Sequence, residues 1–524
     1  MRLRRASDAT GRRAPSRGDR EGFVIVAVLI VVVILSLAAY RFTDLMTAEY
    51  RAAARSEDAA QARYAARSAV HYAAAMLSDP DSLANDLGGN PFAENAFQTQ
   101  VVRSGAVPRQ EARFAFVAVV PDGSGGYKQQ FGCVLDETGK LNINALIQVD
   151  SSGQVLYNAL MALNLPNLTS DIADAIVDWV DGDDDPRDGG AESDFYISQS
   201  QPYRAKNGPL NSLDELLLVK GVTPQILYGN DRNRNGISDD DPSGGTFDRG
   251  LADYLTVYGR EINLNSQGVL RINVNDSDDL PTTYQNLSAV LPQELADFIM
   301  AYKLFTTAQV DPTMTMSSTT SGGADQVSQA VQTALSGAPT NKNRVTSLCD
   351  LMTAQVTLPA DPTAPAGTMP TVVPSPLLDQ SKAASMLAAL LDNTTTLKNV
   401  ELPPRVNVNS AGREVIGAIP GMTSDEADAI IAQRDAQSPT DPATITGAWL
   451  LTSGAVSQAT YRSISNYVTG RTMVYRVQAI GYFGQGGPVA RVEAVIDTNQ
   501  GAPRILYYRD LTDLDTPRGF EPQR

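Results

Sequence analysis

The chain carries an unbroken apolar stretch close to its N-terminus, FVIVAVLIVVVILSLAAY, which runs from Phe23 to Tyr40. None of these 18 residues is charged. A helix needs roughly 20 apolar residues to cross the hydrocarbon core of a bilayer. The stretch therefore predicts a single membrane-spanning helix.

The residues on either side of this stretch decide how it is used. Seven arginines and three acidic residues precede residue 22, and such a basic flank stays in the cytoplasm while the rest is translocated. A cleaved secretory signal peptide is the alternative, but no clear small-residue cleavage site directly follows the stretch. Instead, good helix formers continue from Arg41 to Leu77 without glycine or proline. We therefore expect one long helix over residues 23–77, apolar in its first third and amphipathic in the rest.

The composition narrows the classes of function. The 524-residue chain has 59 acidic against 42 basic residues, a net charge of −17, which argues against nucleic acid as a partner of the whole chain. Its one histidine, His71, nearly excludes a histidine-based triad or a multi-histidine metal site. The two cysteines, Cys133 and Cys349, lack zinc-type spacing. They either form a disulfide in an oxidising compartment or are two small buried residues.

Three short asparagine motifs divide the body of the chain. LNIN occupies residues 141–144, INVN residues 272–275 and VNVN residues 406–409, and a further INLN lies at 262–265. Each of the three is followed by a helical pattern containing the pair Ala–Asp, and then by a third sub-pattern. The repeats predict three copies of one helical unit. We expect the asparagine side chains to bond to local backbone where the chain enters each unit.

Strand-like segments with alternating apolar residues flank the three units. They lie at residues 113–120, 131–136, 475–480, 489–496 and 504–509. The fold class is therefore α+β, with a long helix packed on an antiparallel sheet and a helical insertion between early and late strands. Two segments rich in Thr, Ser, Pro, Gly and Ala, 306–337 and 358–375, are interpreted as loose loops.

An Asn/Asp-rich loop is similar to the start of an EF-hand calcium loop. Oxygen-bearing side chains recur at alternate positions, and a glycine at the sixth position allows a sharp turn. The twelfth position is Pro242 instead of glutamate, so the loop is not a complete EF-hand. The predicted Ca²⁺ ligands are Asp231, Asn233, Asn235, the carbonyl of Ile237, Asp239, and Asp240 or Asp241. The alternative is a solvated Asn/Asp-rich turn.

A second acidic loop holds eight carboxylates between Asp178 and Asp194. So many negative charges repel strongly without a counter-ion. The predicted Ca²⁺ ligands are Asp181, Asp183, Asp185, Glu192 and Asp194. Paired carboxylates can also act as acid and base catalysts. Nothing in the sequence supplies a nucleophile or a substrate pocket, so we expect a structural protein and no catalytic residues.

The start of the chain resembles a type III prepilin signal, with a basic leader, then Gly22, then Phe23 at the start of the apolar stretch. The resemblance implies that a prepilin peptidase cuts between Gly22 and Phe23 and that the new N-terminus is methylated. Most pilins have glutamate as the fifth residue after the cut, where this chain has Ala27. That glutamate is thought to pair with the amine of the preceding subunit, so its absence implies a tip subunit. Simple divergence of the motif is the alternative.

The leader, long helix, strands, helical units and acidic loop together resemble the protein K family of type II secretion systems, whose members are minor pseudopilins. The closest similarity is WVDGDDD at 179–185 with GGAE at 189–192. The resemblance implies a pilin-like fold with a large α-helical insertion of helix-hairpin-helix or SAM-like repeats. The implied divisions are a leader (1–22), the long helix (23–77), early strands (78–140), the insertion with its calcium loops (141–468), late strands (469–510) and a flexible tail (511–524).

The resemblance also implies a location and partners. The protein would be a single-pass inner-membrane protein with its N-terminus cytoplasmic and its body periplasmic. Its partners would be the I- and J-type minor pseudopilins, the major pseudopilin, the secretin and the secreted exoproteins. Helix-hairpin-helix modules often bind DNA, but Thr223 and Thr423 replace hairpin glycines, so no nucleic acid is expected. The alternatives are a minor pilin that primes a type IV pilus and a membrane-anchored DNA receptor of the competence type.

Overall fold

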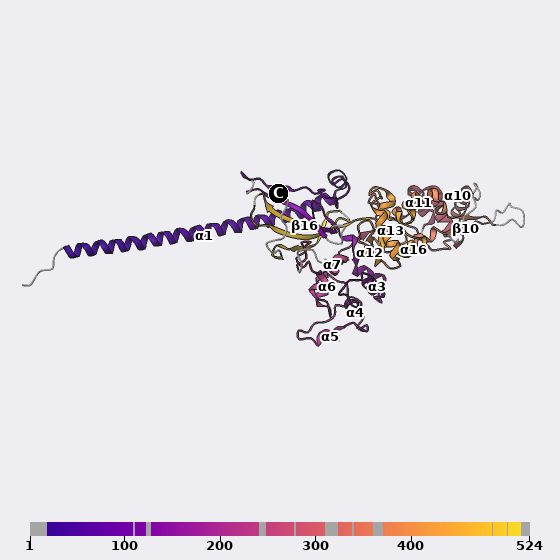
Figure 1. Ribbon diagram of the computed structural model, residues 1–524. Coiled ribbons are helices and arrows are strands. Elements are labelled where there is room, and N and C mark those ends of the chain that lie inside the picture. Colours follow the sequence, from indigo (N-terminus) through magenta and orange to yellow (C-terminus); the bar gives the residue numbers. More distant parts are fainter. Residues whose placement is uncertain are drawn as a thin grey trace, which may run out of the picture.

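The computed structural model shows an elongated molecule in which a single helix extends from a sheet, with a helical body on the far side of that sheet (Figure 1). It describes the whole chain except residues 1–17, 108–109, 122–126, 240–247, 277–278, 310–322, 338–339, 360–369, 485, 500 and 515–524. Most of the predicted leader and most of the predicted flexible tail therefore lie outside the described residues.

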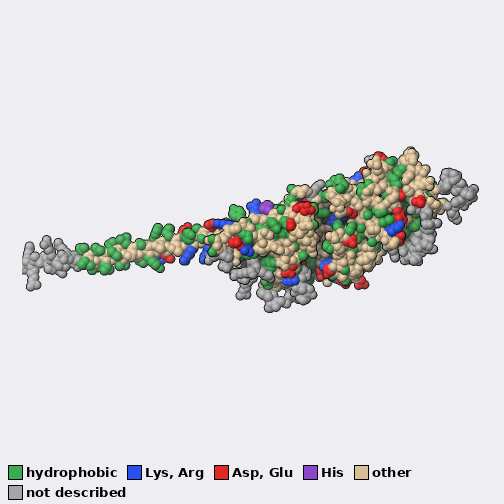
Figure 2. Space-filling model, turned by 90° about the horizontal axis from the view of Figure 1, so that it is seen from above, with side chains coloured by type: hydrophobic (Ala, Val, Ile, Leu, Met, Phe, Trp, Pro, Cys, Tyr) green, Lys and Arg blue, Asp and Glu red, His purple; other side chains and the backbone are tan. Residues whose placement is uncertain are grey.

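The long helix α1 spans Gly18–Ser78 without a break, as the sequence predicts. Its apolar segment, Phe23–Tyr40, is not buried by any other part of the described chain, and Figure 2 shows hydrophobic side chains along this free end. Its last turns are buried against the sheet, where small residues such as Ala62, Ala66 and Ala69 allow a close approach. At Gly481 of the sheet, a Cβ atom would lie 1.9 Å from the carbonyl oxygen of Ala62, so only glycine fits there.

The sheet is antiparallel and joins the two ends of the chain. Its main path is β1 (Gln100–Arg103), β2 (Ala112–Pro121), β16 (Val474–Phe483), β17 (Ala490–Asp497) and β18 (Arg504–Asp510), while β3 (Tyr127–Phe131) pairs with β2 and β4 (Leu135–Asp136) with β16. Four of the five predicted strands are confirmed. The fifth, 131–136, was wrong as one strand, because Gly132 (φ 73°) turns the chain between β3 and β4.

The three repeated motifs each open a helical unit that a parallel two-residue pairing closes. In the first unit β5 (Leu141–Asn142) pairs with β6 (Leu255–Thr256), in the second β8 (Ile272–Asn273) with β12 (Thr394–Thr395), and in the third β14 (Val406–Asn407) with β15 (Val468–Thr469). The additional INLN motif behaves differently: its β7 (Glu261–Ile262) pairs antiparallel with β13 (Glu401–Leu402). The chain therefore enters and leaves each unit at two strands that lie next to each other.

The two asparagines of each motif form different hydrogen bonds. The first accepts a hydrogen bond from nearby backbone, as predicted; Asn273, for example, accepts from the N–H of Asn275 at 2.9 Å. The second reaches across the unit: Asn275 exchanges two hydrogen bonds with the backbone of Val345, at 2.8 and 3.0 Å. Asn144 forms the same pair with Leu210. The second asparagine thus holds the unit together in place of a strand.

Helices fill the units and share one hydrophobic core. The first unit holds α2 (Ile143–Val149), α3 (Gln154–Ala162), α4 (Ser170–Val180), α5 (Ser193–Ile197), η4 (Leu213–Leu218), α6 (Pro224–Tyr228) and α7 (Leu251–Tyr254). The second holds α8 (Leu280–Val290), α9 (Gln293–Leu304), β9 (Thr306–Gln309), α10 (Gly323–Leu335), η5 (Leu348–Leu351), β10 (Ala354–Thr357), β11 (Val372–Pro374), η6 (Pro376–Leu378) and α11 (Gln380–Asn393). The third holds α12 (Arg413–Gly417), α13 (Ser424–Arg434), α14 (Pro442–Thr446), α15 (Trp449–Thr452) and α16 (Gln458–Ile464).

Two predicted features are corrected by the structure. The segment 306–337 is not a loose loop throughout, because it contains β9 and α10; Val327 and Val331, one helical turn apart, bury α10 in the core. Part of 358–375 likewise forms β11, which pairs with β10. Leu511, the first residue of the predicted flexible tail, is buried.

The two cysteines are both free and buried. Cys133 follows β3 in the sheet domain, whereas Cys349 lies in η5 in the core of the helical units. Burial raises the pKa of the Cys133 thiol to about 12. The structure thus shows two small buried residues in place of a disulfide.

Candidate metal centre

Three carboxylates converge between α4 and α5. Asp181 ends α4, Asp183 follows two residues later, and Glu192 immediately precedes α5. One oxygen from each lies within 4.8 Å of the others. The loop brings both helix ends together, so residues far apart in the loop face one point. Three oxygen ligands at this spacing suit a hard cation such as Ca²⁺.

Three oxygens of the two buried members of this group, Asp181 and Glu192, lack hydrogen-bond partners among the described residues. Glu192 is only 4% exposed, yet neither of its carboxylate oxygens accepts a hydrogen bond, and Asp181 Oδ1 is also unpaired. Burial, and secondarily the neighbouring carboxylates, raise the pKa of Glu192 to about 7 and that of Asp181 to about 6. Buried acceptors are almost always satisfied in proteins. A cation between these carboxylates would satisfy them, so the residues fit a metal ion.

Neighbouring residues fix the loop around the three carboxylates. Asp178 is fully buried in α4 and accepts from the backbone N–H of Arg187 at 3.2 Å. Gly190 lies so close that a Cβ atom would be 1.8 Å from Asp178 Oδ2. Lys220 donates to the carbonyls of Gly189 and Gly190, at 3.0 and 2.9 Å. These contacts fix the chain at Gly189 and Gly190, just before Glu192, through groups of the protein itself.

Two predicted ligands of this loop are not brought to the group. Asp185 and Asp194 are both exposed, and neither belongs to the convergent set. Asp185 instead donates its backbone N–H to Asp183 at 3.0 Å, within the loop turn. Asp194 sits in the first turn of α5, where its side chain faces solvent. Alternating spacing in sequence does not reveal these directions, because the loop is not a regular element.

The Asn/Asp-rich loop at 231–239 folds tightly on itself. Asp231 accepts from the backbone N–H groups of Asn235 and Gly236, at 2.8 and 2.9 Å. The Asn233 amide donates to Asp239 at 2.9 Å. Gly236 has φ 80°, which supplies the sharp turn that the sequence predicts. Asp240 and Asp241 lie outside the described residues. These oxygens already accept protein hydrogen bonds, in contrast to those of Asp181 and Glu192.

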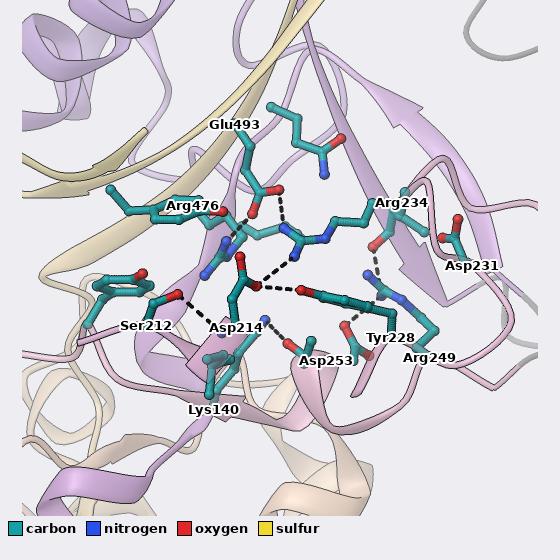
Figure 3. A pocket seen from close by; sticks show the side chains of 17 residues that line it. Lys140, Ser212, Asp214, Tyr228, Asp231, Arg234, Arg249, Asp253, Arg476 and Glu493 are labelled. Atoms are coloured by element: carbon teal, nitrogen blue, oxygen red, sulfur yellow. Dashed lines mark hydrogen bonds and ion pairs between the residues drawn. The ribbon is translucent and has the colours of Figure 1, made fainter. Parts of the chain in front are cut away.

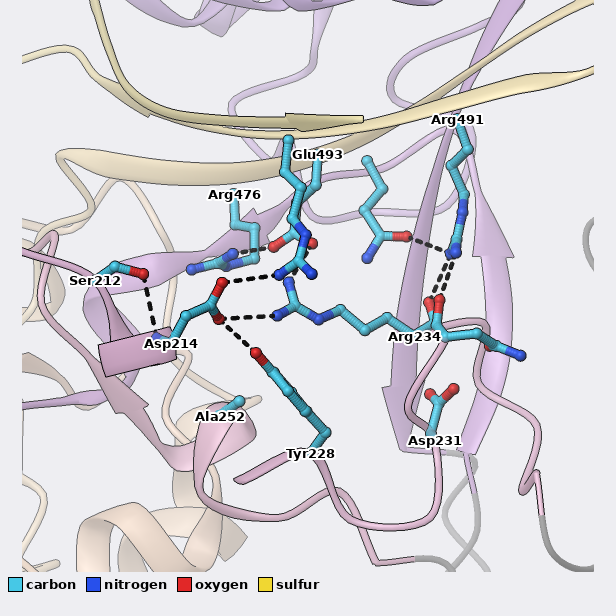
Figure 4. Close-up of polar contacts among 12 residues, drawn as sticks. Ser212, Asp214, Tyr228, Asp231, Arg234, Ala252, Arg476, Arg491 and Glu493 are labelled. Carbon is cyan, nitrogen blue, oxygen red and sulfur yellow. Dashed lines mark hydrogen bonds and ion pairs between the residues drawn. The ribbon is translucent and has the colours of Figure 1, made fainter. Parts of the chain in front are cut away.

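The same loop is packed on the sheet. Arg491 of β17 donates to the backbone carbonyls of Asn233 and Arg234 (Figure 4). Gln129 of β3 donates to the carbonyl of Asn235 at 2.7 Å. The loop therefore connects the first helical unit to the sheet, a contact that its sequence does not reveal.

A buried charge network lies beside this loop and was not predicted from the sequence. Glu493 of β17, 1% exposed, lies between the guanidinium groups of Arg234 and Arg476 (Figure 3). Burial would raise the pKa of Glu493, but the two guanidiniums hold it well below its usual range. Arg476 also binds Glu137 at 2.5 Å. The adjoining cavity of about 60 Å³ has room for only a few waters. The network therefore joins the first unit to the sheet.

The region that holds the candidate metal ligands is similar to a known protein family. Residues 139–228 match the family described as type II secretion system (T2SS), protein K. This segment of the chain is similar to the protein K family, and the match does not extend over the rest of the chain. The matched segment includes Asp181, Asp183 and Glu192 but ends before the loop at 231–239, so the convergent carboxylates lie in the protein K region.

Individual protein K relatives are partial matches. The type II secretion system protein K of Klebsiella pneumoniae is 29% identical over 212 residues, which cover 39% of this chain and 58% of the relative. A putative protein K of Escherichia coli K12 is 34% identical over 93 residues, covering 18% and 28% of the two chains. The crystal structure of a GspK-GspI-GspJ complex from enterotoxigenic E. coli aligns with 12% identity and a TM-score of 0.35, covering 88% of this chain and 99% of the other.

Proposed function

We propose that this protein is a minor pseudopilin at the tip of a type II secretion pseudopilus, a structural part of protein export across the outer membrane. One observation carries the proposal. A single helix has a wholly exposed apolar segment at Phe23–Tyr40, whereas its last turns, from Ala62 to Leu77, are buried in the core of the sheet domain. The apolar segment needs lipid or neighbouring helices, and the last turns fix the helix to a folded head. The similarity of residues 139–228 to protein K favours this machine over a type IV pilus.

The N-terminal anchor would be oriented by its basic leader, with the head in the periplasm and the helix in the inner membrane. Cleavage between Gly22 and Phe23, with methylation of Phe23, would remove the leader and retain the membrane helix. The absence of a glutamate at Ala27 supports a position at the tip. An unpaired carboxylate within the bilayer is costly, and a first subunit has no earlier amine to pair with it.

The partners proposed for this chain follow from its similarity to protein K. The solved complex named above contains a K, an I and a J subunit, and we propose the corresponding I- and J-type pseudopilins as partners here. The major pseudopilin, the secretin and the exoproteins would be met in the course of export. A structural role is in keeping with the protein K family, which is a component of the secretion machine and not a known enzyme.

We propose Ca²⁺ as the ion held by Asp181, Asp183 and Glu192. Calcium would supply the positive charge that the buried carboxylates lack, and would tie the end of α4 to the start of α5. The role would be structural, since the ion would stabilise the folded unit and no reaction is assigned to it. The loop at 231–239 is a weaker candidate for a second ion, because its oxygens already accept hydrogen bonds.

The test of the function is co-purification. The full chain would be tagged and expressed in its host membranes with the I- and J-type pseudopilins, then extracted in mild detergent. We expect both small pseudopilins to be recovered with it. A host strain that lacks its own protein K should also regain secretion when this chain is supplied. The matched control is the same chain with Ala66→Glu, which places a charge where α1 is buried on the sheet. This variant should recover neither small pseudopilin. Recovery of DNA or of type IV pilus subunits instead would contradict the proposal.

A further inference from the structure

A cavity of about 310 Å³ lies between the second and third helical units. Its walls include the closing strands of both units, at Thr394–Thr395 and Val468–Thr469, and residues of α11, α14 and α16. The volume is at the lower end of the range for small-molecule sites, roughly 300–1,000 Å³. It is about five times the volume of the cavity at the charge network, which is about 60 Å³. The space is large enough for a small organic group.

The charges on the cavity wall are of one sign. Arg271, which precedes β8, and Arg405, which precedes β14, both line it, and none of the described lining residues is acidic. The chain as a whole has 59 acidic residues and a net charge of −17. An acid-free cavity with two guanidiniums is therefore the opposite of the protein's average surface, and it favours an anion.

The buried charges behind the wall do not balance. Arg405 binds Glu261 through two nitrogens, with Nε–Oε2 at 2.8 Å, and Arg471 binds Asp392. The buried Arg271 donates its Nε–H to the backbone carbonyl of Asp392 at 3.0 Å, but among the described residues the carboxylate paired with it is the distant Glu261, at 3.9 Å. Three guanidiniums thus face two carboxylates, an excess of one positive charge. Burial, and then the nearby Arg405 and Arg471, lower the pKa of Arg271 to about 10.

The rest of the wall decides what kind of anion fits. Leu391, Leu402 and Ile445 are among the apolar residues that line the cavity, and they would pack on an uncharged body. Apolar surface buried in this way is worth about 25 cal/mol per Å². A single negative charge would offset the single excess positive charge, whereas a dianion such as phosphate would leave a buried negative charge.

We propose that this cavity binds an organic monoanion, a carboxylate on an apolar body. The carboxylate lies against Arg271 and Arg405, and the body lies among the leucines and Ile445. Two sources carry this chemistry: a free short-chain acid and the carboxyl terminus of a polypeptide with an apolar last residue. Because the cavity lies between two units, the ligand also bears on how those units pack together.

The experiment measures binding to the full-length protein in a non-ionic detergent by titration calorimetry. Hexanoate is the probe, hexanamide is its neutral match and inorganic phosphate is the dianion. We expect saturable one-to-one binding of hexanoate and at least about tenfold weaker binding of hexanamide, since a charge-assisted hydrogen bond contributes that much. Arg271→Gln should weaken hexanoate binding by a similar factor. The exposed Arg413→Gln, in the same body but away from the cavity, should leave it unchanged.

A second variant keeps the test decisive if Arg271→Gln does not fold. Ser465, which directly follows α16, lines the cavity, and Ser465→Leu fills space without altering any charge, so it should abolish binding of hexanoate. Equal binding of hexanoate and hexanamide, equal binding of phosphate, or no binding by any probe would overturn the proposal. A short peptide ending in leucine, with a free or an amidated terminus, separates the sources. Tighter binding of the free terminus than of hexanoate assigns a polypeptide end, and weaker binding assigns a free acid.

Discussion

Among the described residues, the carboxylate of Glu192 lacks a positively charged or hydrogen-bonding partner. It is buried, both of its oxygens are unpaired, and Asp181 and Asp183 lie beside it. Without a cation, the group is favourable in the folded protein only when it is protonated. The pKa values of Glu192, about 7, and Asp181, about 6, both lie above the ordinary values of 4.5 and 3.8. The folded state therefore holds protons that the unfolded chain has already released.

The first prediction concerns pH and calcium. For carboxylates with a raised pKa, stability is fully present below the unfolded pKa and is lost as pH rises through the folded pKa. The melting temperature of calcium-stripped protein should therefore fall between pH 5 and pH 8. Calcium at 100 times its dissociation constant should restore about 2.7 kcal/mol. Glu192→Gln should reduce both effects, and the exposed Asp185→Asn should reduce neither. A melting temperature of the wild-type protein that does not depend on calcium would contradict the proposed Ca²⁺ site.

At the scale of one element, α1 is defined by its close contact with the sheet. Gly481 of β16 allows the backbone of α1 to approach at Ala62, because any Cβ atom would overlap the Ala62 carbonyl oxygen. Gly481→Val should lower the free energy of unfolding of the head by about 3 kcal/mol or more, at the upper end of overpacking costs. Urea unfolding in detergent measures it. Gly417→Ala, whose added Cβ would meet only an ordinary contact, is the control.

A further prediction at this scale concerns the free half of α1. Ala27→Glu places a carboxylate within the apolar stretch, and a tip subunit has no preceding amine to pair with it. We expect exoprotein secretion to fall, or the subunit to move from the tip, when the variant replaces the wild-type chain. Ala27→Ser is the matched control, since it changes polarity without adding charge. Normal secretion with the subunit still at the tip would argue against the tip position.

At the scale of the whole molecule, the helical body is joined to the sheet through buried charges. Glu493 holds Arg234 of the first unit and Arg476 of the sheet together. Glu493→Gln would leave two guanidiniums without their shared carboxylate, and should destabilise the protein by about 3–5 kcal/mol, the usual cost of breaking a buried pair. Glu401→Gln removes a carboxylate that is 55% exposed and should cost about 1 kcal/mol or less. Equal urea midpoints for the two variants would contradict a joining role.

The sequence by itself determined the features that depend on local periodicity and on chemistry close along the chain. The apolar stretch, the continuous helix to residue 78, four of the five strands and the three repeated units all follow from patterns of neighbouring residues. The first asparagine of each motif could also be predicted, because its hydrogen bond is local.

Only the tertiary structure decided which distant residues meet. Asn275 reaches Val345, Arg491 holds the loop at 231–239, and Glu493 lies between two arginines from different parts of the chain. In the acidic loop, both Asp181 and Asp185 have the residue type of a ligand, but only Asp181 turns inward. A loop has no fixed period that assigns its side chains to one face. Direction there is set by packing against other elements, and that packing exists only in the folded chain.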